Sequence, residues 1–252
     1  MLTVDLNSDL GESYGNYTIG KDDEIIPLIS SANVACGFHA SDPSVMQKTV
    51  DMIKKSGRTG IGAHPAFPDL MGFGRRYMDL TMAEVRSIMI YQMGALEGFA
   101  QMYGLKMNHV KPHGALYNAT FQDKELAETI AETVKAYNPD LKLLGLSNQN
   151  LVKAGEAAGL PVRHEVFADR AYEDDGTLVS RREEGAMITD TNEAVGRVIR
   201  MVKEGKTESI NGRDIDIQAD SVCVHGDGPN ALEFVKEIRQ QLGENGIEIK
   251  TM

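Results

Sequence analysis

The sequence predicts an α/β fold: a (β/α) barrel of seven mostly parallel strands, or eight if residues 247–250 also pair. Two observations lead to this prediction. Short apolar runs alternate with helical segments along the whole chain, as in a parallel sheet whose helices pack outside it. These runs are also too numerous for two separate small sheets. No linker, repeat or low-complexity segment interrupts them, so residues 1–252 are expected to form a single domain. An open doubly wound sheet is the alternative.

The expected strands are short apolar runs that lead into polar residues or glycine. They lie at residues 4–7, 33–38, 59–64, 108–113, 141–146, 162–169 and 221–227, with the eighth at 247–250. The one irregular stretch is residues 207–219, where Asn211-Gly212 predicts a small hairpin inserted before the last strand of the barrel.

The helices between the strands carry their own start and stop signals. Asp42 followed by Pro43 predicts the beginning of a helix that Gly57 ends. Thr81 with Glu84 predicts a capping box at the start of a second helix. That helix is expected to run to about residue 103, with further helices at about 123–137, 148–158, 190–204 and 229–244.

Composition and charge exclude some classes of partner. The net charge is −11, from 26 Lys and Arg against 37 Asp and Glu, and no basic cluster is present, which argues against nucleic acid and anionic membranes. No apolar run approaches the roughly 18 residues of a membrane span, and the N-terminus lacks the pattern of a signal peptide. We therefore expect a cytoplasmic protein in which Cys36 and Cys223 are buried free thiols.

Polar side chains follow most of the expected strands. In parallel α/β folds the functional site is built where the carboxyl ends of the strands meet. Five of the six histidines belong to strand ends, which buried hydrogen-bond networks alone do not explain. The residues that follow the strands are, in chain order, Asn7, Asp9, Glu12, His39, Asp42, His64, Lys111, His113, Glu165, Asp169, Arg170, His225 and Asp227.

Residues 108–113 contain three of these groups at alternating positions. His109, Lys111 and His113 project to the same side if the segment is extended. Pro112 marks the end of the strand, because proline cannot donate to a central ladder. Lys111 and His113 are therefore expected at the mouth of the barrel, and His109 deeper, in a structural role.

Two other patterns concern anions. Arg75 and Arg76, in the loop after the third strand, are expected to hold a carboxylate or a phosphate, since guanidinium groups bind such anions bidentately. Residues 15–21 have the spacing of a P-loop, yet Asp22 stands where a magnesium-binding Ser or Thr is required. No P-loop is predicted.

Several segments together carry a family pattern. DLNSDLGESYG, SSANVACGFHASDP, GIGAHPAFPDLMGFGRR, VKPHGALYN, EVFADRAY and VHGD occur in this order over nearly the whole chain. They closely resemble the LamB/YcsF family. The resemblance implies a barrel similar to the seven-stranded glycoside hydrolase and polysaccharide deacetylase folds. It also implies ATP-dependent opening of the lactam of 5-oxo-L-proline (pyroglutamate) to L-glutamate, with ATP and Mg²⁺ used in a complex with two further subunits, B and C.

This reaction suggests roles for the residues at the strand ends. Asp9 and His64 are expected to activate water or to handle protons, and Lys111 and His113 to stabilise developing negative charge. His39 is placed with this catalytic group. The residues expected to bind substrate are Asn7, Glu12, Arg75, Arg76, Glu165, Asp169, Arg170 and His225.

Two other functions remain open from the sequence. In a metal-dependent hydrolase of the deacetylase type, Asp9, His39 and His64 would hold a divalent ion that lowers the pKa of bound water. Alternatively, the chain binds and positions the substrate while partner subunits do the chemistry.

Overall fold

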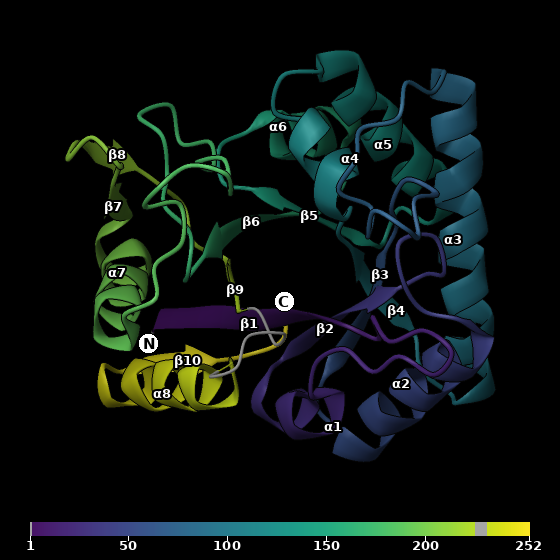
Figure 1. Ribbon diagram of the computed structural model, residues 1–252, viewed down its shortest axis with the longest axis horizontal. Coiled ribbons are helices and arrows are strands. Elements are labelled where there is room, and N and C mark those ends of the chain that lie inside the picture. Colours follow the sequence, from purple (N-terminus) through teal and green to yellow (C-terminus); the bar gives the residue numbers. More distant parts are fainter. Residues whose placement is uncertain (1, 225–230) are drawn as a thin grey trace.

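The computed structural model describes residues 2–224 and 231–252. Among these residues, seven parallel strands close into a barrel with helices on its outside (Figure 1). The ring closes because β9 pairs with both β6 and β1. The barrel prediction is confirmed, and the open-sheet alternative is wrong. The strands of the ring are β1 (Leu2–Leu10), β2 (Ser31–Ala35), β3 (Gly60–His64), β4 (Met107–Val110), β5 (Lys142–Leu146), β6 (Val162–Phe167) and β9 (Ser221–Cys223).

The eighth strand, β10 (Ile247–Ile249), pairs in parallel with β1 but lies outside the closed ring. The first strand is long enough for three partners. Its residues 2–4 pair with β10, residues 5–7 with β9 and residues 7–10 with β2. The last strand of the chain therefore runs beside the first.

The helices begin and end close to the expected positions. The Asp42 side chain accepts hydrogen bonds from the Ser44 and Val45 N–H groups, and Gly57 ends that helix at a φ of 69°. Thr81 and Glu84 form the predicted capping box. The helices are α1 (Asp22–Ile25), η1 (Ile26–Leu28, a 3₁₀ turn), α2 (Pro43–Ser56), α3 (Met82–Met102), α4 (Gly114–Ala119), α5 (Lys124–Tyr137), α6 (Asn150–Ala158), α7 (Thr191–Glu204) and α8 (Ala231–Glu244).

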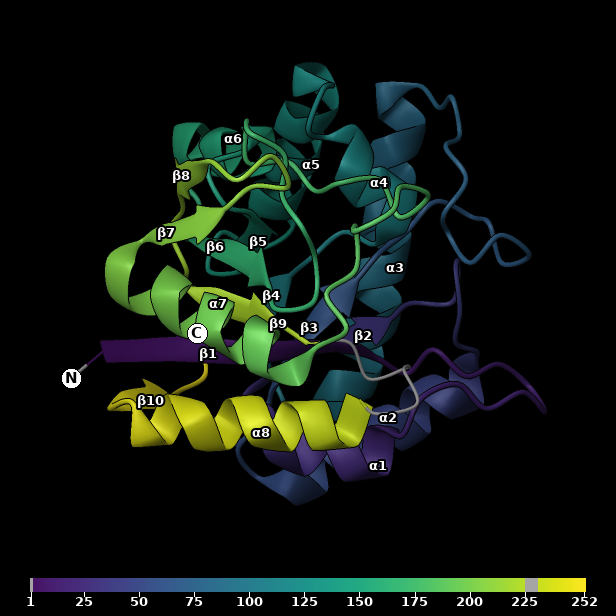
Figure 2. The same ribbon diagram turned by 60° about the vertical axis from the view of Figure 1, so that its left-hand side comes forward.

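Three of these segments, α1, η1 and α4, are not predicted by the sequence, because each is too short to display a helical repeat of apolar residues. The predicted hairpin is confirmed: β7 (Lys206–Glu208) pairs antiparallel with β8 (Asp214–Asp216), as Figure 2 shows. Gly212 takes the left-handed conformation that the turn needs, with φ of 77°. None of the described helices is both long and apolar enough to cross a membrane.

Alternate residues of β1 point into the barrel, and those residues are polar. Near its start, Asp5 accepts hydrogen bonds from Ser30, Ser31 and Ser221. Further along β1 come Asn7 and then Asp9, so one strand carries a polar column from one end of the barrel to the other. The apolar core lies between the strands and the helices. Cys36 and Cys223 are both buried free thiols, as predicted, and Cys223 Sγ lies inside the barrel, 3.4 Å from Lys111 Nζ.

Candidate functional site

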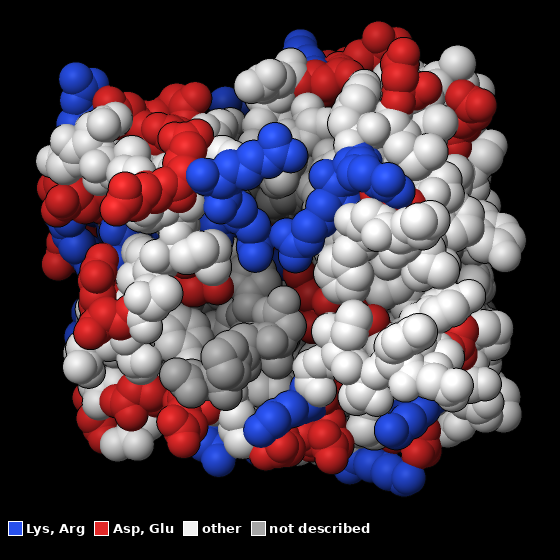
Figure 3. All heavy atoms as spheres, viewed as in Figure 1, with Lys and Arg blue, Asp and Glu red and all other residues white. Residues whose placement is uncertain are grey.

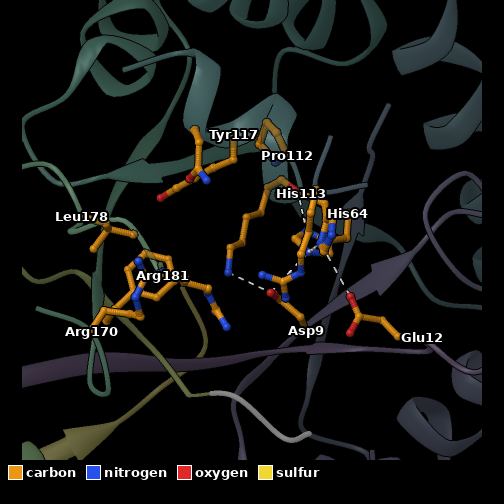
Figure 4. A pocket seen from close by; sticks show the side chains of 14 residues that line it. Asp9, Glu12, His64, Pro112, His113, Tyr117, Arg170, Leu178 and Arg181 are labelled. Carbon is orange, nitrogen blue, oxygen red and sulfur yellow. Dashed lines mark hydrogen bonds and ion pairs between the residues drawn. The ribbon is translucent and has the colours of Figure 1, made fainter. Parts of the chain in front are cut away.

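A pocket opens at the carboxyl ends of the barrel strands, where the sequence places its polar residues (Figure 4). Its floor and walls combine carboxylates, imidazoles, a lysine and arginines. The lining residues are Asp9, Glu12, His64, Arg75, Lys111, Pro112, His113, Gly114, Tyr117, Asn118, Phe167, Arg170, Leu178 and Arg181. Half of them, seven of the fourteen, were predicted as site residues from the sequence.

Lys111 lies at the floor of the pocket between two carboxylates. Its Nζ is 3.0 Å from Asp9 Oδ1 and 2.7 Å from Glu165 Oε1, and all but 3% of its side chain is buried. The Tyr117 hydroxyl donates to the other oxygen of Glu165 at 2.7 Å. Burial alone would lower the pKa of Lys111, but attraction by Asp9 and Glu165 raises it well above its usual value. Lys111 is therefore a fixed positive charge.

Beneath Asp9, a layer of amides and one imidazole fixes its position. Asn33 Nδ2 donates to Asp9 Oδ1 at 2.8 Å and to Asn7 Oδ1 at 2.7 Å, and His109 Nε2 donates to Asn33 Oδ1 at 2.7 Å. His109 is thus deeper than Lys111, as expected. Gly62 makes room for it, because a Cβ at residue 62 would overlap the His109 ring.

His64 and His113 face each other, and each uses one ring nitrogen in a hydrogen bond to a backbone carbonyl. His64 Nδ1 donates to the carbonyl of Lys111 at 2.7 Å, and His113 Nε2 donates to the carbonyl of Phe73 at 2.9 Å. The two remaining nitrogens, His64 Nε2 and His113 Nδ1, are 2.9 Å apart. A hydrogen bond between these two nitrogens requires a proton on one of them. His64 Nε2 is also 3.3 Å from Asp9 Oδ2.

His39 lies behind this pair rather than in the pocket lining. Its ring stacks on His113 with centroids 3.7 Å apart, and its Nε2 is 3.0 Å from Glu12 Oε1. Burial, with repulsion from His64, lowers the pKa of His39 well below its usual range. Burial and repulsion from His39 do the same for the pKa of His113, so both rings are neutral at neutral pH.

Four of these groups lie close enough together to hold a metal ion. Glu12, His39, His64 and His113 each offer a ligand atom, and these atoms lie within 4.8 Å of one another. Three imidazoles and a carboxylate are donors typical of zinc and related divalent ions, so the donor set fits. Because His39 and His113 are stacked almost in parallel, at 6°, one of the rings must turn before both can bind an ion in their planes. Compared with the set expected from the sequence, Glu12 replaces Asp9 and His113 is added.

The buried imidazoles make the protein sensitive to acid. The pKa values of His39 and His113 are lowered, and that of His109 falls to about 3, mainly through burial. Below the unfolded pKa of about 6.5, the unfolded chain binds protons that the folded chain does not. Each of these histidines therefore lowers the free energy of unfolding by up to ~1.4 kcal/mol for each pH unit of acidification. Asp5 and Asp22, whose pKa values are raised by burial, act in the opposite direction.

The effect of the three histidines on the free energy of unfolding is larger than the opposite effect of the two carboxylates. The free energy of unfolding is therefore expected to fall by about 1 kcal/mol or more between pH 6.5 and pH 5.5. Urea unfolding at pH 7.5, 6.5 and 5.5 measures it. A free energy that stays constant or rises over this range would contradict the neutral, buried state of these rings.

Arginines line the outer part of the pocket. Figure 3 shows Lys and Arg side chains gathered around a hollow at the centre of this face. Arg75, Arg170 and Arg181 line the pocket, and Arg182 lines an adjoining groove. Arg76 is not with them: it forms an ion pair with Asp69, and 67% of its side chain is exposed. The expectation that Arg76 contributes to the pocket is not met, because the loop directs it to the Asp69 carboxylate instead.

The other predicted residues occupy different positions. Asn7 and Glu165 are fully buried under the pocket and act on it through Asp9 and Lys111. Asp169 precedes Arg170 and does not line the pocket. His225, like Asp227, lies outside the described residues.

Tyr117 and Arg181 are among the seven lining residues that were not predicted as site residues from the sequence. Tyr117 comes four residues after His113 on the short helix α4, and only the prediction of that helix would have placed it. Arg181 belongs to the long connection between β6 and α7, where no strand end marks its position.

Comparison with known proteins agrees along the whole chain. The LamB/YcsF family matches residues 4–252. A Staphylococcus haemolyticus protein, named as the A subunit of 5-oxoprolinase, is 53% identical, with both chains fully covered. A Clostridium beijerinckii protein of the same name is 56% identical over 99% of this chain and 97% of its own. The crystal structure of a lactam utilization protein from Thermus thermophilus has a TM-score of 0.94 and 45% identity, with both chains fully covered. The chain therefore belongs to the LamB/YcsF family.

Proposed function

We propose that this chain is the lactam-opening subunit of a 5-oxoprolinase, which hydrolyses 5-oxo-L-proline to L-glutamate with ATP and Mg²⁺ in a complex with subunits B and C. The observation that carries the proposal is the pocket at the barrel mouth, where Asp9, His64 and Lys111 stand together. The substrate is suggested by the full-length relatives named for 5-oxoprolinase and by the relative named for lactam utilization.

The proposed chemistry divides a difficult hydrolysis into two easier steps. A lactam carbonyl is a poor electrophile, and transfer of the γ-phosphoryl group of ATP to its oxygen activates it. Water then adds to the carbon, the carbon–nitrogen bond breaks and the nitrogen takes a proton, which leaves an acyl phosphate. A second water releases phosphate and gives L-glutamate, so the two waters and one ATP balance the products L-glutamate, ADP and phosphate.

We assign proton handling to Asp9 and His64. Asp9 lines the pocket beside Lys111 and His64, where its carboxylate can accept a proton from water. The proton shared by His64 and His113 is placed to protonate the departing nitrogen. Lys111 offers the positive charge for developing negative charge on oxygen. His113 does not share that role with Lys111, because its Nε2–H is bonded to the Phe73 carbonyl.

Reconstitution tests the proposal. The purified chain is combined with subunits B and C, ATP, Mg²⁺ and 5-oxoproline, and glutamate is measured. Glutamate formation that needs all three subunits is the expected result. A rate that does not change when this chain is left out would refute the assignment.

A second candidate is a metal-dependent amide hydrolase, favoured by the cluster of Glu12, His39, His64 and His113. A divalent ion held there would supply Lewis-acid activation of water, while Asp9 beside His64 would accept the proton. Metal analysis of the purified chain and the same glutamate assay after dialysis against a chelator distinguish the two. Bound metal and activity restored only by the metal favour this candidate. Full activity without transition metal favours the first.

A further inference from the structure

We propose that Arg75, Arg170 and Arg181 form a phosphate subsite beside the reacting floor, which receives the phosphoryl group of an activated lactam. The inference rests on the proposed function and deepens it. It assigns to this chain the binding of the phosphoryl group that the reaction finally releases as phosphate. Figure 4 shows Arg170 and Arg181 on the side of the pocket opposite His64.

Arg170 is the best-defined part of this subsite. Its residue is only 6% exposed, and its Nη2 donates to the carbonyl of Val179 at 2.5 Å. Its Nε, also buried, has no hydrogen-bond partner among the described residues. A buried guanidinium N–H without an acceptor costs free energy, and an anionic ligand in the pocket that it lines would supply one.

Positive charge is concentrated around this group. Burial, followed by repulsion from Arg181 and from Arg75, lowers the pKa of Arg170 to about 10, although Asp169 acts in the opposite direction. Arginines that repel one another in a partly desolvated pocket are typical of sites whose ligand is an anion.

The arginines would hold the phosphoryl group apart from the residues proposed to carry out the reaction. The reaction pocket adjoins a groove of about 630 Å³, and the two share Arg75, Arg170 and Arg181 as lining residues. Arg182 also lines the groove. A small cyclic substrate over Asp9 and Lys111 would therefore place a group attached to its carbonyl oxygen among the arginines, with a way out for released phosphate.

The number of guanidinium groups favours a phosphoryl group over the substrate carboxylate alone. One carboxylate is satisfied by one bidentate arginine, whereas a phosphoryl group has three terminal oxygens and about two negative charges. The floor of the pocket disfavours a bound anion, because three carboxylates, those of Asp9, Glu12 and Glu165, accompany the single lysine there.

Calorimetric titration of the full-length chain with inorganic phosphate tests the subsite. Arg181→Gln removes a guanidinium group, and Arg170→Lys removes the buried Nε–H. Each substitution is expected to raise the phosphate Kd about tenfold or more. Arg86→Gln is the matched control, because Arg86 is half-exposed and pairs with Glu132 on the outer helices. Its phosphate Kd is expected to stay at the native value.

Parallel titrations with 5-oxoproline and with pyrrolidin-2-one, which lacks the carboxylate, identify the anion. The proposal is overturned if native protein does not bind phosphate, or if Arg181→Gln and Arg170→Lys weaken only 5-oxoproline binding, since the arginines would then hold the carboxylate. If phosphate binding responds as expected but the reconstituted complex forms no glutamate, the subsite stands and the proposed function fails.

Discussion

Replacing Lys111 by methionine is expected to abolish most turnover and to destabilise the fold. The side chain lies between Asp9 and Glu165, and its loss leaves two carboxylates buried without their cation. Removal of one partner of a buried ion pair costs about 3 to 5 kcal/mol. Loss of the positive charge that stabilises a developing oxyanion reduces turnover about 10²- to 10³-fold. Urea unfolding and the glutamate assay measure the two effects.

The pH dependence of the Lys111→Met variant checks this explanation. In the variant, buried carboxylates remain without their cation, and the burial of an uncompensated carboxylate is costly only while it is ionised. The loss of unfolding free energy should therefore be larger at pH 8 than at pH 5. Lys142→Met, at the opposite end of the neighbouring strand β5, is the control. An equal loss in both variants would contradict a special role for the buried charges.

Asp9→Asn is expected to reduce turnover about 10²- to 10⁴-fold, the range of a lost general base. Asparagine has nearly the same shape and can still accept the hydrogen bond from Asn33, so the barrel should remain folded. The amide cannot accept a proton from water, and the substitution removes the carboxylate that lies 3.3 Å from His64 Nε2. Turnover per folded molecule, measured in the three-subunit complex together with circular dichroism, gives the result.

Asp5→Asn is the matched control for this variant. Asp5 is on the same strand and points into the same barrel, but it lies at the other end, where its side chain bonds to Ser30, Ser31 and Ser221. Its variant should retain the native rate per folded molecule. If Asp9→Asn also turns over at the native rate, the chain binds the substrate and the partner subunits perform the hydrolysis.

Much of the fold can be predicted from the sequence because barrel strands and caps have local signals. The alternation of apolar runs with capped helices predicts every strand of the ring, and Asn211-Gly212 predicts the hairpin. Closure itself has no local signal, since β9 pairs with strands that are far from it along the chain. The short helix α4 was missed because it is too short to display a helical repeat of apolar residues, and it begins at Gly114, whose φ is 51°.

The candidate site was predictable wherever a strand end determines the direction of a side chain. Asp9, His64 and Lys111 come from three strands and meet, as expected. Side chains on loops were not predictable in this way. Arg76 is adjacent to a pocket residue in sequence yet bonds to Asp69, whereas Arg181, in a connection without a repeating pattern, lines the pocket. Their directions depend on tertiary contacts rather than on a strand's alternation.

The pairing of β1 with β9 and β10 has a consequence for the order in which the protein can fold. Leu2 pairs with Ile247 and Asp5 with Ser221, so β1 obtains two of its partner strands only from the final part of the chain. Contacts so distant in sequence slow folding. On the ribosome, the growing chain therefore presents an open strand edge until its last residues are made, and such edges are sites of association between chains. We expect efficient production of this protein to depend on protection of that edge during synthesis.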